Sequence, residues 1–168
     1  MIAPVLTTDR LTLRPFALAD FEAFAALHLA ERARLGWTID SRDEAGQLFL
    51  AMAGEWALRG VGMWALERTD TGEFIGHAGF HHPLTEPEGE LGWAVVAEAE
   101  GQGFAHDAAL AARAWRYANG TTAPVSRMDA RNVRSIALAE RLGAQLEKRV
   151  EFAPDAVALH YRHPKEAA

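Results

Sequence analysis

Two glycines stand between a predicted strand and a predicted helix, in the stretch Gly101-Gln102-Gly103-Phe104. Backbone N–H groups at the start of a helix have no internal partner, and the helix dipole favours an anion there. Glycine lets the backbone approach a ligand closely and adopt a positive φ. The stretch therefore indicates a phosphate site, although a plain strand-to-helix turn would carry the same glycines. A dinucleotide fingerprint needs Gly or Ala where His106 stands, and the Gly-Lys-Ser/Thr ending of a P-loop is absent.

Titratable side chains near this stretch could move a proton. Glu90 begins the strand that leads to the glycines, and its carboxylate could act as a general base, directly or through water. The alternative is an edge carboxylate satisfied by solvent. His77, His81 and His82 lie on or just after the preceding strand. A neutral imidazole there could take the same role, although most such histidines are surface residues.

The composition argues against several kinds of site. The chain has no cysteine, which excludes disulfides, thiolate metal ligands and cysteine nucleophiles. No His-Glu-x-x-His motif is present, and His160 and His163 fall in a predicted strand where residues three apart face opposite ways, so no metal is expected. A net charge of −6 repels phosphate backbones, so we expect no nucleic acid partner. The same charge would favour a cationic substrate.

Apolar periodicity indicates the elements that must position these residues. Leu11 and Leu13 alternate with polar residues, which predicts a strand over 8–16, and a helix is expected over 19–30. Ser41 and Glu44 form a capping box for a helix that ends at Gly60. Further strands are predicted at 63–68, 73–81, 90–96, 125–129, 145–152 and 156–162, and further helices at 104–119 and 132–142.

This order, β-α-α-β-β-β-α-β-α-β-β, predicts an α+β fold with a mixed central sheet flanked by helices. No repeat and no linker rich in Pro, Gly or Ser divides the chain, so residues 1–168 are expected to form one domain. The start lacks a basic region and a long apolar stretch, so neither a signal peptide nor a membrane partner is expected. A cytoplasmic location and a monomer or homodimer are expected.

The glycine stretch resembles the acyl-coenzyme A signature of the GNAT N-acetyltransferases, which reads Gln or Arg, two residues, Gly, one residue, Gly or Ala. Gly103 and Ala105 match this signature. Glu100 stands at its first position and would place a carboxylate near the expected diphosphate. Other segments resemble the RimJ/RimL branch in the same order, so that the likeness runs from about Leu6 to about Arg162. These segments are 6–16, 72–76, 90–93, 132–135 and 139–144.

The resemblance implies acetyl-coenzyme A as donor and a primary amine as acceptor. It implies cofactor contacts at these positions: Trp93, Ala94 and Val95 along the pantetheine arm, Gly101, Gln102, Gly103, Phe104, Ala105 and His106 around the diphosphate, and Asn132 near the thioester. The tyrosine that protonates the departing thiolate in this superfamily would stand at Ala139. Ser135 is the substitute that the RimJ/RimL type suggests, unless it only bonds the backbone of its own helix. Trp37 lies in a loop where the superfamily places acceptor contacts.

Amine attack requires a neutral amine. A lysine side chain with a pKa near ~10.4 is only about 0.04% neutral at pH 7, whereas an α-amine near ~8 is about 10% neutral. An α-amine therefore needs less help from a base such as Glu90. Two alternatives stay open: a non-catalytic acyl-coenzyme A binding or sensing module, and acetylation of a small cationic antibiotic or polyamine.

Overall fold

The computed structural model describes residues 2–36, 38–119, 123–154 and 156–165. One eight-stranded sheet runs in the order β1-β2-β3-β4-β5-β6-β8-β7. Its strands are β1 (Leu6–Thr7), β2 (Leu11–Arg14), β3 (Met63–Arg68), β4 (Phe74–His81), β5 (Glu90–Val95), β6 (Val125–Asp129), β7 (Gln145–Ala153) and β8 (Ala156–Arg162). The pairing of β5 with β6 is parallel and the other pairings are antiparallel. The predicted mixed sheet is confirmed.

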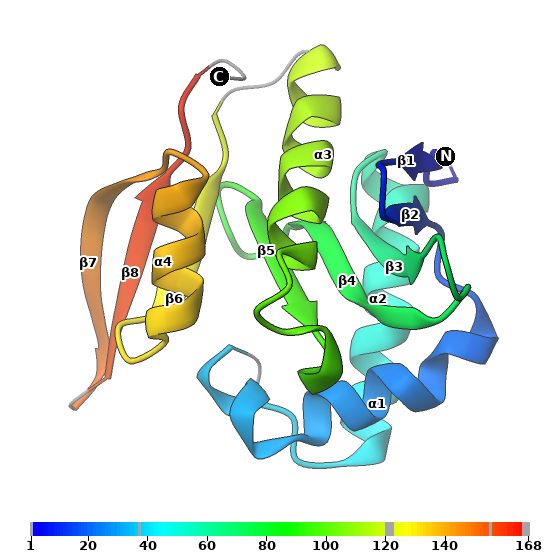
Figure 1. The fold of residues 1–168 in the computed structure, drawn as a ribbon. Helices are drawn as coiled ribbons and strands as arrows, with labels where there is room; N and C mark the ends of the chain where they lie inside the picture. The colour runs from blue at the N-terminus through cyan, green and yellow to red at the C-terminus, as the bar shows by residue number, and fades with distance from the viewer. Residues whose placement is uncertain (1, 37, 120–122, 155, 166–168) are drawn as a thin grey trace.

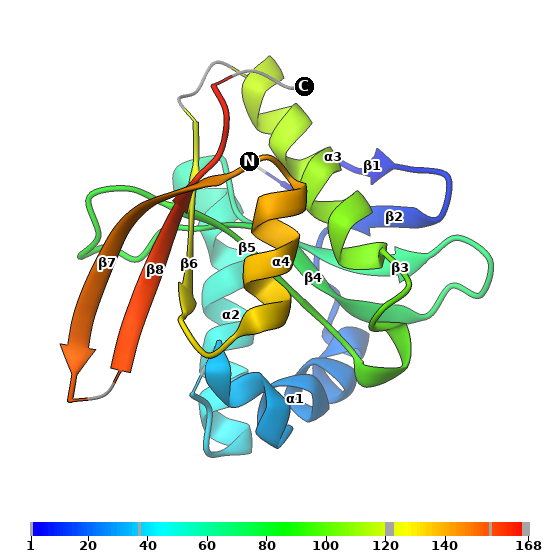
Figure 2. The same cartoon turned by 60° about the vertical axis from the view of Figure 1, so that its left-hand side comes forward.

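Helices cover both faces of this sheet (Figure 1, Figure 2). The α-helices are α1 (Phe21–Leu29), α2 (Arg42–Arg59), α3 (Phe104–Ala118) and α4 (Val133–Arg141), and short 3₁₀ helices are η1 (Leu18–Asp20), η2 (Glu31–Leu35) and η3 (Ala97–Ala99). Helices α3 and α4 lie on one face, and α1 and α2 lie on the other. No helix within the described ranges combines the length and the hydropathy that crossing a bilayer requires.

The N-terminal part differs from the sequence prediction in two places. The strand predicted over 8–16 is present as β2 but is shorter, and a preceding strand that was not predicted, β1, pairs with it because Thr8 closes a turn between the two. Its N–H donates to the Leu11 carbonyl (2.8 Å), and its Oγ1 accepts from the Leu11 N–H (3.0 Å). Such local side-chain bonds compete with a strand ladder. Helix η2 was not predicted.

The core explains why α3 can lie close to the sheet. Phe104, Ala108 and Ala112 are buried along one stripe of α3 and belong to one cluster with Trp64 and Leu91 of the sheet. Alanine side chains leave little space between a helix and a strand, so the N-terminus of α3 is held directly beside β5. The start of this helix is therefore fixed by packing rather than by a side-chain cap.

The ladder between β5 and β6 is short. It contains one register pair, Glu90 with Val125. Next to it, the buried Ser126 hydroxyl donates to the Leu91 carbonyl (2.6 Å). The Ser126 oxygen lies 2.9 Å from His163 Nε2, and the Nδ1 atom of that ring lies 3.0 Å from Arg113. A side-chain bond thus continues the contact between the strands at the point where backbone pairing stops.

Candidate functional site

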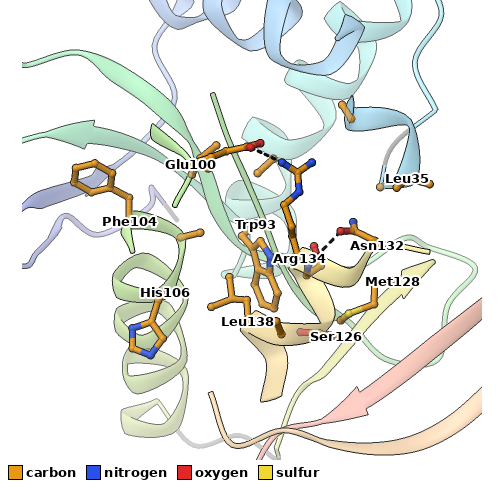
Figure 3. A pocket seen from close by; sticks show the side chains of 18 of the residues that line it. Leu35, Trp93, Glu100, Phe104, His106, Ser126, Met128, Asn132, Arg134 and Leu138 are labelled. Atoms are coloured by element: carbon orange, nitrogen blue, oxygen red, sulfur yellow. Dashed lines mark hydrogen bonds and ion pairs between the residues drawn. The ribbon is translucent and has the colours of Figure 1, made fainter. Parts of the chain in front are cut away.

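A pocket of about 460 Å³ lies between β5 and β6, beyond their single register pair. Its walls come from β5, η3 and the following loop, the start of α3, β6 and α4. Leu27 and His28 of α1 and Leu35 of η2 line it as well. Figure 3 shows side chains from α3, β5, β6 and α4 converging on this space. Diverging strands and two helices with adjacent N-termini therefore make one site.

The structure brings most of the sequence-predicted residues to this pocket. The lining includes Glu90, Trp93, Ala94, Val95, Gly101, Gly103, Phe104, Ala105, His106, Asn132 and Ser135. Gln102 is not part of the lining, because its side-chain amide turns away and donates to the Glu98 carbonyl (2.6 Å). Sequence-predicted residues from Glu90 to Ser135 thus share one cavity.

The loop before α3 has the backbone that its glycines predicted. Gly101 has φ 71° and Gly103, the N-cap residue of α3, has φ 86°. No side chain caps this helix, so its first N–H groups keep their hydrogen-bonding capacity toward the pocket. A side-chain carbon added at Gly101 would meet nothing within 4 Å. The loop is therefore open on the side where a ligand would lie.

Arg10 contacts this loop and the start of α3, and the sequence pattern did not predict that contact. Its guanidinium donates to the Gln102 carbonyl (2.8 Å) and to the Asp107 carboxylate (2.6 Å). It also lies over the Phe104 ring, 4.7 Å from the ring centroid. Because Asp107 is 97 residues away along the chain, only the fold brings the two together.

Glu90 is a carboxylate in the pocket wall. Burial raises its pKa, and the nearby positive charge of Arg127 partly opposes this. Its Oε2 atom is buried and has no hydrogen-bond partner among the described residues. Glu90 also pairs across the β4–β5 ladder with His81, whose Nδ1 lies 3.1 Å from the Glu55 carboxylate. A carboxylate with an elevated pKa and an unused oxygen can accept a proton.

The histidines predicted near the site differ in their positions. His77 is completely buried, and its Nε2 lies 2.9 Å from Nε2 of His28, which does line the pocket. Burial lowers the pKa of His28 to about 4 and holds that of His77 well below its ordinary value. His81 and His82 are not among the lining residues. His28 was not predicted, because its position on α1 gives no sign of a partner on β4.

The first turn of α4 presents two polar side chains. Asn132 is the N-cap residue, and its Oδ1 accepts the Ser135 N–H (3.1 Å). The Ser135 hydroxyl makes no hydrogen bond within the described part of the chain, so the backbone-bonding alternative finds no support. Both residues line the pocket. Their placement leaves the hydroxyl and the Asn132 amide group able to bond a ligand.

An ion pair crosses from α4 to the glycine loop. Arg134 donates to the carboxylate of Glu100, as the dashed line in Figure 3 shows, and both residues line the pocket. Trp93 lies beside this pair in the same view. Glu100 immediately precedes Gly101, so the pair spans the two helix N-termini that face the cavity.

The remaining sequence predictions concern aromatic and metal-ligating residues. Trp56 and Trp64 are buried in the core, and their indole N–H groups donate to backbone carbonyls. Trp37 lies outside the described residues. Within the described ranges no group of three or more His, Asp or Glu side chains has an arrangement that could hold a metal ion.

Known proteins resemble this chain in sequence and in fold. The family model described as "Acetyltransferase (GNAT) domain" matches residues 10–145. The crystal structure of an acetyltransferase from Agrobacterium tumefaciens str. C58 is 36% identical, with a TM-score of 0.86, over 98% of this chain and 96% of that chain.

Two further similarities are more limited. The uncharacterized N-acetyltransferase YoaA of Bacillus subtilis (strain 168) is 31% identical over 109 residues, which is 62% of this chain and 61% of the relative. The match thus spans less than two thirds of that protein. A RimL ribosomal L7/L12 α-N-protein acetyltransferase, solved in complex with coenzyme A, is 20% identical with a TM-score of 0.79, over 98% of this chain and 100% of that chain. At that identity the likeness shows the fold alone.

Proposed function

Because the chain belongs to the acetyltransferase (GNAT) domain family, we propose that it transfers the acetyl group of acetyl-coenzyme A to a primary amine. The observation that carries this proposal is the pocket between β5 and β6. There an uncapped helix N-terminus, the part of β5 beyond its register pair with β6 and a buried carboxylate face one cavity. The helix N-terminus would bind the phosphates of the anionic thioester, the strand would bind its arm, and the carboxylate would accept a proton from the amine.

The donor would lie along β5 and across the start of α3. Trp93 and Ala94 have β4 on one side and no β6 partner in the register on the other, which leaves a strand edge for the amides of a pantetheine arm. The N–H groups after Gly103 would bind the diphosphate, because an uncapped helix start favours an anion. The open space over Gly101 suits close approach of a phosphate.

The reaction needs a proton acceptor for the amine and a donor for the sulfur. In direct transfer the amine nitrogen bonds to the thioester carbonyl carbon, the carbon–sulfur bond breaks, and the thiolate that leaves takes up a proton. Glu90 would take the proton that the amine loses. The Ser135 hydroxyl would donate a hydrogen bond to the sulfur as negative charge develops there.

For the acceptor we propose an α-amine at a protein N-terminus, as in the RimJ/RimL type. The L7/L12 acetyltransferase that shares the fold acts on such an amine. An α-amine is about 10% neutral at pH 7, so a carboxylate acting through water would suffice as the base. The acceptor would enter from the side of α1 and η2, where Leu27 and Leu35 line the pocket.

A thiol-release assay tests the proposed function. The protein is mixed with acetyl-coenzyme A and, in separate reactions, with α-amino peptides, polyamines and aminoglycosides. We expect amine-dependent release of free thiol, and fastest with an α-amino peptide. Turnover of aminoglycosides or polyamines alone would reassign the acceptor. Calorimetric binding of coenzyme A with no thiol release from any amine would identify a non-catalytic binding module.

A further inference from the structure

We propose that Arg134 binds a phosphate of coenzyme A, and that Glu100 holds the same guanidinium while the ligand is absent. Coenzyme A would then bind by displacing a carboxylate that this chain supplies itself. The inference rests on the proposed function, and it assigns opposing roles to two residues of one ion pair. Glu100 would weaken the binding that Arg134 strengthens.

The geometry places both side chains at the anion-binding end of the pocket. Glu100 is the C-cap residue of η3 and directly precedes Gly101, so its carboxylate stands at the loop that leads to the start of α3. Arg134 projects from the first turn of α4 toward that carboxylate (Figure 3). A ligand phosphate at the N-terminus of α3 would therefore lie within the region that this ion pair already occupies.

The chemistry of the two groups makes an exchange of partners feasible. A guanidinium presents a planar set of donors that fits a carboxylate and a phosphate equally well. Coenzyme A carries a diphosphate and a further phosphate, so it offers more negative charge than one carboxylate. Arg134 can therefore leave Glu100 for the ligand without losing a charge-assisted hydrogen bond.

The exposure of the pair shows that breaking it costs little. The side chain of Arg134 is 61% exposed and that of Glu100 is 31% exposed. Ion pairs with this exposure contribute little to stability. The pair is thus weak enough for a more highly charged anion to displace. After displacement the Glu100 carboxylate would remain near the bound phosphates and repel them.

Calorimetry tests this inference with two ligands, coenzyme A and pantetheine. Pantetheine has the same arm but no phosphate. Glu100→Gln should tighten coenzyme A binding about three- to tenfold, because one repelling charge and one competitor are removed. Arg134→Gln should weaken it about tenfold, as expected for loss of a charge-assisted hydrogen bond. Neither variant should change the Kd for pantetheine. In the Arg134→Gln background, the gain from Glu100→Gln should be smaller.

Two neighbouring residues provide matched controls. Glu98→Gln and Arg131→Gln remove the same charges two and three residues before the test positions, but neither residue lines the pocket. Each should change the Kd for coenzyme A less than about twofold. Equal effects of the control and test variants would overturn the inference, because bulk charge would then explain them.

The remaining outcomes separate this inference from the proposed function. If the unaltered chain binds coenzyme A and Glu100→Gln leaves that Kd unchanged or raises it, the inference is wrong and the proposed function stands. An equal change in the Kd for pantetheine would also overturn the inference, because the ion pair would then act through the shape of the pocket and not through the phosphates. If the unaltered chain binds neither ligand, both the proposed function and this inference are wrong.

Discussion

Glu90 shows how a single carboxylate can be costly for folding and useful for chemistry. Burial raises its pKa, and no described residue satisfies its Oε2 atom. Glu90→Gln should lower the acetyl-transfer rate, most strongly at pH values where little amine is neutral but the Glu90 carboxyl group is still ionised. The measurement is the pH–rate profile of both proteins. An unaltered profile would mean that solvent or a histidine takes the proton.

The same substitution should affect stability in the opposite direction. When a carboxyl group has a higher pKa in the folded chain than in the unfolded chain, the folded chain loses stability as the pH rises from the unfolded pKa, about 4.3, through the folded pKa. Glu90→Gln should therefore stabilise the chain at pH 7 and make little difference at pH 4. Glu86→Gln is the control, because its side chain is 44% exposed and lies outside the pocket lining. Urea unfolding at both pH values gives the comparison.

Ser135 is the second residue whose role one substitution can decide. Ser135→Ala should slow the chemical step roughly 10- to 150-fold, because a hydrogen bond to a charged group contributes about 1.5–3 kcal/mol. The urea midpoint should barely move, since the hydroxyl bonds no described residue. Asn132→Ala provides the stability reference, because loss of its N-cap bond costs about 1 kcal/mol. An unchanged single-turnover rate would remove Ser135 from the mechanism.

Sequence patterns predicted those site residues whose signal comes from residues close to them in the chain. Glycines before a helix and an asparagine three residues before a serine are local signals, and both line the pocket. Arg10 and His28 could not be found this way, because their partners are 97 and 49 residues distant. Residues 101–106 were predicted to contact the cofactor as one continuous range, but the side chain of Gln102 turns toward Glu98.

At the scale of elements, helix boundaries were predictable wherever a cap fixed them. Ser41 caps α2 by accepting the Glu44 N–H (3.2 Å), as the capping box predicted. The reciprocal bond goes to the N–H of Asp40 rather than to that of Ser41. The short ladder between β5 and β6 was not predictable, because it depends on the contact of Ser126 with Leu91 across the sheet.

The loop before α3 makes a prediction about backbone conformation. A side chain at φ 86° costs about 1–2 kcal/mol, and a carbon added at Gly103 would lie 3.1 Å from the guanidinium of Arg10. Gly103→Ala should therefore lower the unfolding free energy by roughly that amount and weaken coenzyme A binding. Gly72→Ala is the matched control: φ is 73°, nothing lies within 4 Å, and the residue is in the β3–β4 hairpin. Its stability loss should be similar and its coenzyme A affinity unchanged.

Across the whole molecule, buried neutral histidines connect the sheet to the helices around it. His28 and His77 join α1 to β4 through facing ring nitrogens. His163 joins the end of the chain to β6 and α3 through Ser126 and Arg113. None of these rings can be protonated without placing a charge in the protein interior. The fold is thus held at several points by rings that stay neutral in the folded chain below the ordinary pKa of histidine.

This arrangement predicts that the chain loses stability in mild acid. Burial lowers the pKa of His28 and His163 to about 4, and that of His77 also falls well below its ordinary value. A histidine with a lowered folded pKa contributes stability above its unfolded pKa, about 6.5, and loses it as the pH falls toward the folded value. At pH 5.5 the unfolded chain should therefore bind about two to three more protons than the folded one.

Urea unfolding between pH 7.5 and pH 4.5 measures this difference, because the slope of unfolding free energy against pH counts the protons taken up. Two to three protons correspond to a slope of about 3–4 kcal/mol per pH unit. His163→Gln should reduce the slope by about one proton whatever it does to the absolute stability, since only the pH dependence is compared. Unfolding free energies that stay flat from pH 7 to pH 5 would show that these rings are protonated in the folded chain. The buried histidines would then have to be accommodated as charged groups, which their surroundings of Phe24, Phe16 and the strand backbone do not favour.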